Sequence, residues 1–206
     1  MPSHKAVDGS ETELMERLTS ILLATPLITQ VLRTVRELEL PDWLLFSGAV
    51  YQPVLNHLAG RALTYGIKDY DLGYFDAADI SYQAEDRVIL RVASAFEEPL
   101  RSMVEVRNQA RVHLWFEAKF GEAYPPLTRT AEALERFTSP TFAVGARLEP
   151  DDRLHIEAPF GLADLFALRL RPNPRFSTLG FARTAANAVK RWPELVVGVA
   201  DQATSA

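Results

Sequence analysis

Apolar residues along the chain recur first at helical and then at strand-like spacing. They follow a three-to-four period on both sides of Pro26, which predicts two helices within residues 11–39. The evenly apolar residues 43–46 predict a short buried strand, and alternation over 103–107 predicts another. The remaining pattern predicts strands at 67–75, 141–148 and 154–158, and helices at 50–59, 85–97, 111–120, 130–137, 161–170 and 178–191.

Helices and strands therefore interleave along the whole chain, which indicates an α+β (mixed α/β) fold with a mixed sheet flanked by helices. The 206 residues fit one domain, and the sequence contains no internal repeat and no low-complexity linker. We predict a single compact unit over 1–206. Its parts are N-terminal helices (11–40), a central core (41–125) and a C-terminal α/β extension (126–206).

The composition is that of a globular protein with an acidic balance. Hydrophobic residues make up 48% of the chain, which is enough for a core. There are 22 basic and 27 acidic residues, a formal net charge of −5, and the longest basic clusters are pairs. A protein that binds a nucleic-acid backbone usually carries a basic stripe, so long nucleic acid is disfavoured as a partner.

Several classes of site are excluded by what the sequence lacks. Without cysteine there are no disulfides, thiolate metal sites or cysteine nucleophiles. The four histidines are too scattered for a zinc cluster, and there is no Gly-x-Ser-x-Gly elbow or Walker-type phosphate loop. Residues 1–10 are polar and no window approaches about 20 apolar residues, so we expect a cytoplasmic protein with no membrane span.

Two carboxylates stand out because they lie two residues apart in a predicted strand. Alternation places Asp69 and Asp71 on one face, about 7 Å apart at the backbone. An Asp-x-Asp often decorates a solvated edge, but this one lies between Ile67 and Leu72, an unusual place for idle surface charge. Two ionised carboxylates in a partly buried cleft repel each other unless a cation lies between them.

A third acid can complete a metal site. Glu105 lies within the apolar strand 103–107, and if that strand neighbours the first pair it makes a triad for two metals about 3.5–4 Å apart. Mg²⁺ prefers hard oxygen ligands from carboxylates and substrate phosphates. We therefore predict that Asp69, Asp71 and Glu105 are catalytic residues that bind two Mg²⁺ ions, with Mn²⁺ as an alternative.

A glycine turn precedes this region. The strand at 43–46 runs through Ser47-Gly48-Ala49 into the predicted helix. A glycine at such a turn lets backbone N–H groups approach a phosphate at the helix N-terminus. Alone the signal is weak, since most such glycines simply make a turn.

The order of elements is more specific: apolar strand, glycine turn, helix, strand with Asp-x-Asp, helix, strand with a third acid. This order resembles the catalytic unit of the polymerase-β nucleotidyltransferase superfamily. Longer strings resemble one branch, the bacterial nucleotidyltransferase family proteins long catalogued as a domain of unknown function, over residues 40–195. These strings are Ser47-Gly48-Ala49-Val50-Tyr51-Gln52, Gly66-Ile67-Lys68-Asp69-Tyr70-Asp71, the run from Val104 to Trp115, and Ala158-Pro159-Phe160-Gly161-Leu162.

The resemblance implies a polymerase-β-like fold, metal chemistry and a nucleoside triphosphate (NTP) as substrate, but no particular acceptor. The superfamily turn normally pairs glycine with a following serine that touches the triphosphate, whereas here Ala49 follows Gly48. Ser47 lies on the other side of the glycine. Phosphate binding is then expected to rest on backbone amides at Gly48 and Ala49 and on the side chains of Gln52 and Lys68.

Other polar and aromatic residues have two interpretations each. Arg107 shares a strand face with Glu105, so it either steadies the triphosphate or pairs with that carboxylate. Tyr51 and Tyr74 either stack on a base or pack in the core. His113, among apolar neighbours, is more often a core residue than a catalytic one.

The predicted activity is transfer of a nucleoside monophosphate from an NTP to an acceptor hydroxyl, with release of pyrophosphate. The acidic charge favours a small-molecule or protein acceptor. Two alternatives stay open: a catalytically inactive nucleotide-binding or scaffolding protein on the same fold, supported by Ala49, and a metal-dependent phosphohydrolase that uses water. The acceptor, the preferred NTP and the oligomeric state do not follow from the sequence.

Overall fold

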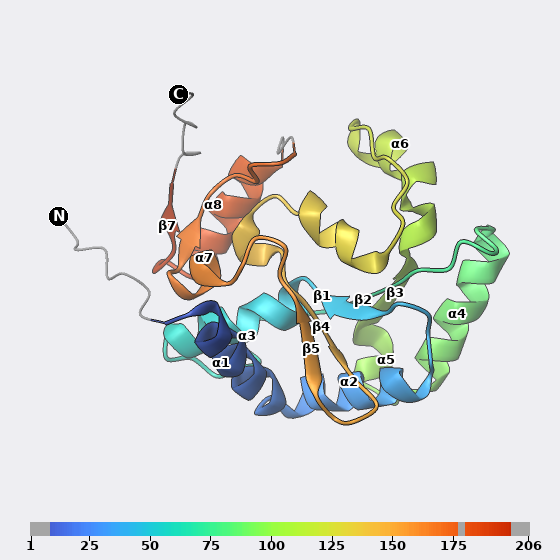
Figure 1. Ribbon diagram of the computed structural model, residues 1–206, viewed down its shortest axis with the longest axis horizontal. Coiled ribbons are helices and arrows are strands. Elements are labelled where there is room, and N and C mark those ends of the chain that lie inside the picture. Colours follow the sequence, from blue (N-terminus) through green and yellow to red (C-terminus); the bar gives the residue numbers. More distant parts are fainter. Residues whose placement is uncertain (1–8, 177–179, 199–206) are drawn as a thin grey trace.

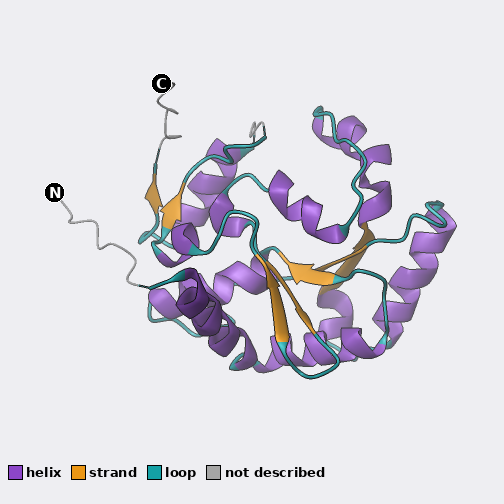
Figure 2. Ribbon diagram, in the orientation of Figure 1, coloured by secondary structure: helices purple, strands orange, loops and turns teal. Residues whose placement is uncertain are grey.

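The computed structural model describes residues 9–176 and 180–198. Its centre is a mixed five-stranded sheet in the order β3-β2-β1-β4-β5, with helices around it (Figures 1 and 2). β2 and β3 are parallel, and the other neighbours are antiparallel. The strands are β1 (Leu44–Phe46), β2 (Tyr70–Tyr74), β3 (Val104–Asn108), β4 (Gly145–Leu148) and β5 (Leu154–Glu157), with a separate parallel pair, β6 (Arg169–Leu170) and β7 (Val196–Val197).

The helices follow the predicted order with a few additions. They are α1 (Glu11–Leu23), α2 (Pro26–Glu37), α3 (Gly48–Leu58), α4 (Tyr82–Ser94), α5 (Leu100–Met103), α6 (Phe116–Phe120), α7 (Ala163–Phe166) and α8 (Phe181–Arg191). Three 3₁₀ helices join them: η1 (Gln109–Leu114), η2 (Thr130–Arg136) and η3 (Pro140–Phe142). The prediction of a mixed sheet flanked by helices is confirmed.

Four predicted elements differ in extent or type. The strand at 67–75 is shorter, because only Tyr70–Tyr74 pairs with β1 and β3. The strand at 141–148 is η3 followed by β4, and the helix at 161–170 is α7 followed by β6. The helix at 111–120 is a 3₁₀ turn followed by α6. The predicted start of the last helix, at 178, lies outside the described residues.

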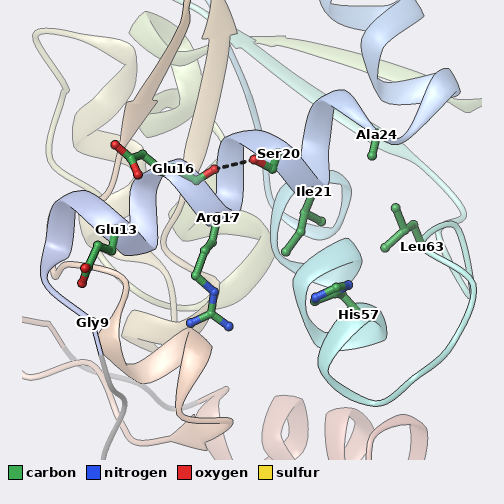
Figure 3. Close-up of a pocket in the computed structure, with 9 residues that line it drawn as sticks. All are labelled: Gly9, Glu13, Glu16, Arg17, Ser20, Ile21, Ala24, His57 and Leu63. Atoms are coloured by element: carbon green, nitrogen blue, oxygen red, sulfur yellow. Dashed lines mark hydrogen bonds between the residues drawn. The ribbon is translucent and has the colours of Figure 1, made fainter.

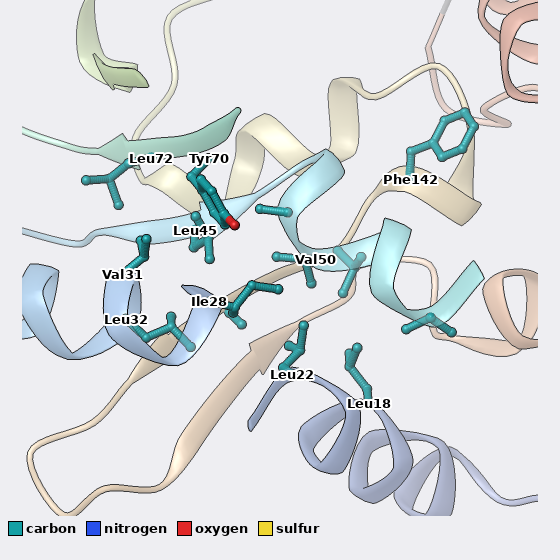
Figure 4. Packing of buried hydrophobic residues seen from close by; sticks show 14 of the residues in the cluster. Leu18, Leu22, Ile28, Val31, Leu32, Leu45, Val50, Tyr70, Leu72 and Phe142 are labelled. Atoms are coloured by element: carbon teal, nitrogen blue, oxygen red, sulfur yellow. The ribbon is translucent and has the colours of Figure 1, made fainter. Parts of the chain in front are cut away.

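The first two helices are set by local signals and by burial. Ser10 and Glu13 form a reciprocal capping box at the start of α1, and Pro26 occupies the first turn of α2. Their buried leucine, isoleucine and valine side chains pack against β1, β2 and α3 in one continuous core, which Figure 4 shows around Val50. The N-terminal helices therefore belong to the main core.

The two faces of the sheet have different chemistry. On β2, Tyr70, Leu72 and Tyr74 are all at most 2% exposed and belong to the main core. Asp71 and Gly73 lie on the opposite face by alternation. Beside Gly73, the Phe46 ring lies so close that a Cβ would come within 2.4 Å of it. One face of the sheet is thus apolar. The other face carries carboxylates and a small cluster of buried apolar residues around Leu44.

Buried hydrogen bonds connect the C-terminal part of the chain to α3. Asn56 is fully buried, and its Oδ1 accepts a hydrogen bond of 2.8 Å from Nε1 of Trp192. The Asn56 amide also donates to the carbonyls of Leu63 (3.0 Å) and Tyr65 (2.9 Å). One side chain therefore joins α3, the loop before β2 and the end of α8.

Within the described ranges, no single helix is long and apolar enough to cross a membrane. Only the pair α1 and α2 reaches that length and composition together, and the two helices are bent by 93° at their junction.

We predict that Asn56→Ala lowers the free energy of unfolding by about 2–4 kcal/mol, because it leaves the Trp192 indole N–H and two carbonyl groups without a buried partner. Urea denaturation measures the change. Asn187→Ala, which truncates an exposed asparagine of α8, is the matched control and should change stability little. Equal behaviour of the two variants would refute the role of Asn56.

Candidate active site

The parallel pairing of β2 with β3 places two of the three predicted acids side by side. Asp71 is the register partner of Glu105, and on its other side it faces Phe46 of β1. Since paired residues of neighbouring strands point to the same face, Asp71 and Glu105 project together from the sheet. The prediction that these two strands are neighbours is confirmed.

A polar cavity of about 230 Å³ lies at the carboxylates. Asp69 and Asp71 line it together, although Asp69 precedes the strand, and the start of α3 lines the opposite side. The predicted residues Gly48, Gln52 and Lys68 also line this cavity. Five of the eight candidate residues therefore meet at one place, although they lie up to 23 positions apart in the sequence.

The turn before α3 presents Ser47, not Ala49, to the carboxylates. Ser47 has φ 62° and ψ −141°, a region that residues with side chains rarely adopt, at a cost of about 1–3 kcal/mol. Its side chain lines the cavity, and its hydroxyl acts to lower the pKa of Asp71. Ala49 is fully buried in the core and does not line the cavity, so the prediction that it contacts phosphate is not supported by its position.

The pKa of Asp71 is raised to about 6, mainly by burial and to a smaller extent by the charges of Asp69 and Glu105. The Ser47 hydrogen bond and the positive charge of Arg107 act in the opposite direction. Asp71 therefore lies among like charges, and ionisation is less favourable for it than for an ordinary aspartate. A bound cation would relieve that repulsion.

Arg191 supplies a cation that its sequence position did not reveal. It lies at the end of α8 and lines the same cavity as Lys68, more than 120 residues away in sequence. Its guanidinium donates a 3.1 Å hydrogen bond to Oε1 of Gln52 and lies against Gly66, where a Cβ would be 3.4 Å from it. The only local signal was the Lys190-Arg191 pair at the end of a predicted helix.

Glu105 and Arg107 lie at the open side of the site. Both are exposed and neither lines the polar cavity. Nη1 of Arg107 donates to the carbonyl of Val106 (2.8 Å), and among the described residues no ion pair joins Arg107 to Glu105. Both side chains are therefore free to contact a ligand beside Asp71.

The three acids do not form a ready-made metal cluster. Across residues 9–176 and 180–198, no three Asp, Glu or His side chains converge closely enough to hold an ion by themselves. Asp69 and Asp71 share a cavity, and Glu105 neighbours Asp71 from the next strand. Any ion held here would need ligands from a substrate as well, which is how Mg²⁺ is usually bound.

The remaining aromatic and basic candidates differ in how deeply their side chains are buried. Tyr74 is 2% exposed on the core face and cannot stack on a ligand, whereas Tyr51 lines the polar cavity. Arg111 forms a buried ion pair with Glu85, which also accepts a 2.9 Å hydrogen bond from the backbone N–H of Asn108. These contacts hold the segment after β3 in place. His113 is half-buried with Nδ1 unpartnered, away from the cavity lining.

A larger cavity of about 840 Å³ lies elsewhere, between α1 and α3 (Figure 3). Its lining includes Glu13, Arg17, Ile21, His57 and Leu63. Glu13 is engaged in the capping box and Arg17 lies over the Phe166 ring at 4.5 Å. This cavity is open and mostly apolar, and it does not gather carboxylates with cations as the polar cavity does.

The comparisons with known proteins agree with this arrangement. A family model described as nucleotidyltransferase matches residues 33–197, which include both sides of the polar cavity. The chain belongs to this nucleotidyltransferase family. No curated protein matches its sequence.

The structure of this family member is similar to an NMR structure described as revealing a CCA-adding enzyme head domain. The TM-score is 0.71 at 21% identity, over 89% of this chain and 95% of that chain. A second similar structure is a CCA-adding enzyme in complex with CTP, with a TM-score of 0.48 and 15% identity, over 88% of this chain and 43% of that one. The first similarity confirms the predicted polymerase-β-type fold of this nucleotidyltransferase.

We predict that Asp71→Asn makes the ligand-free nucleotidyltransferase more stable at pH 8, because the variant removes a buried like charge. The folded-state pKa of about 6 exceeds the ordinary 3.8, so the full penalty is present above pH 6. As the pH falls from 6 towards 3.8 the folded parent takes up the proton, and its disadvantage shrinks.

Thermal unfolding at pH 8 and pH 5 measures this, at about 2–4 °C per kcal/mol for a chain of this length. Asp151→Asn, which changes an exposed aspartate whose pKa is lowered by hydrogen bonding to Arg153, should give no stabilisation. A midpoint for Asp71→Asn that is below the parent's at pH 8 would contradict the charge repulsion.

Proposed function

We propose that this protein transfers a nucleoside monophosphate from an NTP to an acceptor hydroxyl and releases pyrophosphate. The observation that carries the proposal is the polar cavity, where Asp69 and Asp71 face a strand–turn–helix and two cations, Lys68 and Arg191. Carboxylates next to cations and helix N–H groups suit a substrate that brings both a metal ion and phosphates. Family membership supports the enzyme class.

The residues present fit Mg²⁺ as the metal. Asp69, Asp71 and Glu105 offer hard carboxylate oxygens. Burial, followed by the charges of Asp69 and Glu105, raises the pKa of Asp71, and a cation would offset both effects. Asp69 and Asp71 would hold the ions, with Glu105 as an additional ligand on the acceptor side. A bound Mg²⁺ would polarise the transferred phosphate and lower the pKa of the acceptor hydroxyl.

The triphosphate would be held from the α3 side of the cavity. The first N–H groups of a helix have no intrahelical acceptor, and at α3 the first of them belongs to Gly48, which lines the cavity. Gln52 approaches Gly48 so closely that a Cβ there would lie 2.4 Å from its Nε2. With Lys68 and Arg191 beside them, these donors would bind the β- and γ-phosphates and neutralise the leaving pyrophosphate.

The transfer itself replaces one phosphorus–oxygen bond with another. The acceptor oxygen attacks the α-phosphorus, and the bond from that phosphorus to the β-phosphate oxygen breaks. The acceptor proton goes to a neighbouring carboxylate, for which Glu105 is placed at the open side, beside Asp71. Arg107, exposed on the same strand face, would orient the acceptor or the transferred phosphate.

The acceptor in this proposal is a small molecule or a protein side chain. The formal net charge of −5 disfavours a long anionic polymer, and the open side of the site at Glu105 adds a further negative charge. Ser47 weakens the case for an inactive scaffold, because its hydroxyl occupies the cavity that Ala49 does not reach.

We predict that Mg²⁺ with an NTP raises the unfolding midpoint, because a ligand bound only by the folded state stabilises it by about 2.7 kcal/mol at a hundred times its Kd. Asp71→Asn should lose most of that shift and should release no pyrophosphate when incubated with the four NTPs, Mg²⁺ and cell extract. Mass spectrometry of the same mixture detects a nucleotide on an acceptor.

Three outcomes separate the alternatives. Pyrophosphate together with an adduct supports transfer. Release of nucleoside monophosphate without an adduct indicates a phosphohydrolase. A thermal shift with neither product indicates a nucleotide-binding protein without turnover, and an Asp71→Asn variant that responds like the parent would refute the site.

A second prediction concerns Arg191. Arg191→Met should weaken binding of Mg–NTP about tenfold or more, because a charge-assisted hydrogen bond contributes about 1.5–3 kcal/mol. Lys190→Met removes one positive charge from the exposed neighbouring position and is the matched control. Isothermal titration of both variants measures the difference, and equal loss in both would show that only overall charge matters.

A further inference from the structure

A second cavity adjoins the polar one and shares two of its residues. It has a volume of about 650 Å³, and Ser47 and Tyr51 line both cavities. Ligand pockets generally occupy about 300–1,000 Å³, so the polar cavity of about 230 Å³ is too small to enclose a whole nucleotide, whereas the neighbouring one is not. The two cavities therefore meet at Ser47 and Tyr51.

The lining of this second cavity is aromatic. Phe116 and Phe120 of α6 lie on one side with ring centroids 4.7 Å apart, and Tyr51 and Phe142 lie 4.6 Å apart on the other. Phe120 is 50% exposed, and Nζ of Lys119 lies 5.2 Å from its ring centroid. Planar heteroaromatic rings stack on such surfaces regardless of their hydrogen-bonding pattern.

Cations and hydroxyls rim the aromatic cavity. Arg136 comes from the end of η2, and Arg183 and Thr184 come from the first turn of α8. Arg136 already packs over an aromatic ring, with its guanidinium carbon 3.7 Å from the Phe176 centroid. This combination of aromatic faces with guanidinium groups suits a polar heteroaromatic ring better than an aliphatic chain.

Helix α8 contributes residues to both cavities, and their positions indicate how a ligand that spans the two cavities would be oriented. Thr184 lines the aromatic cavity and Arg191 the polar one. Seven residues in a helix are about two turns, so the two side chains leave the same side of α8, about 10 Å apart along its axis. A ligand that carries phosphates at one end and a flat ring at the other would match this spacing, and Figure 1 shows α6 and α8 facing each other above the sheet.

We propose that the aromatic cavity binds the nucleobase of the NTP, which stacks on Phe120 and Phe116 while the triphosphate lies in the polar cavity. The inference rests on the proposed function and adds to it the location of the base. The α-phosphorus then lies at the junction of the cavities, beside Ser47 and Asp71. Besides its aromatic residues, the described lining contains two arginines, two threonines, Ser47 and Glu122, but no asparagine or glutamine. We therefore expect stacking to dominate over base-edge recognition and all four NTPs to bind, purines more tightly.

The experiment compares each NTP with inorganic tripolyphosphate, both with Mg²⁺, by isothermal titration. Tripolyphosphate reports the polar cavity alone, and the NTP reports both cavities. We expect ATP to bind at least fivefold more tightly than tripolyphosphate, and Phe120→Ala to remove most of that advantage without weakening tripolyphosphate binding. Phe120→Trp, which keeps an aromatic face, should retain it, and Tyr82→Ala, at an aromatic residue 65% exposed on α4, is the control.

The possible outcomes distinguish failure of the proposed function from failure of the nucleobase assignment. If neither ligand binds, the proposed function fails and the inference fails with it. If tripolyphosphate binds as tightly as ATP, or Phe120→Ala leaves ATP binding unchanged, the triphosphate site stands and the nucleobase assignment is wrong. Equal weakening of ATP and tripolyphosphate by Phe120→Ala would also overturn it, because the variant would then act on the fold and not on the base.

Discussion

The parallel pairing of β2 with β3 is the constraint on which the site depends. Its register sets Asp71 opposite Glu105 and leaves Phe46 on the other side of Asp71. The result is a concentration of negative charge on a sheet face whose reverse side is packed with tyrosine and leucine. The core therefore stabilises a placement of charges that would be unfavourable by itself. The pKa of Asp71 is raised mainly by burial and also by the neighbouring carboxylates.

The second requirement is the attachment of the C-terminal region to α3. Asn56 and Trp192 form the buried contact, and Arg191 lies next to that contact in the chain. The region after residue 126 is thus more than an extension of a self-contained core. It adds β4 and β5 to the sheet, brings a cation to the polar cavity and provides part of the aromatic cavity.

Together these constraints produce a site with an electrostatic gradient. Cations and helix N–H groups lie at the α8 and α3 end, carboxylates lie at the centre, and Glu105 and Arg107 lie exposed at the open side. Ser47, held in an unusual backbone conformation, stands where the polar and aromatic cavities meet. A nucleotide that spans both cavities would present its α-phosphorus at this junction, which is where the proposed chemistry needs it.

The sequence by itself determined the features that depend on the local spacing of apolar and polar residues. Alternation over Tyr70 to Tyr74 separated the acids from the core side chains, the glycine turn located the start of α3, and the order of elements indicated the polymerase-β-type fold. These signals are local because the two faces of a strand and the first turn of a helix depend on neighbouring residues. Only the tertiary structure decided which of Ser47 and Ala49 faces the carboxylates, and that Arg191 joins Lys68 and Gln52. Backbone geometry at one turn and the docking of a helix more than 120 residues away determine those contacts, and neither leaves a periodic pattern in the chain.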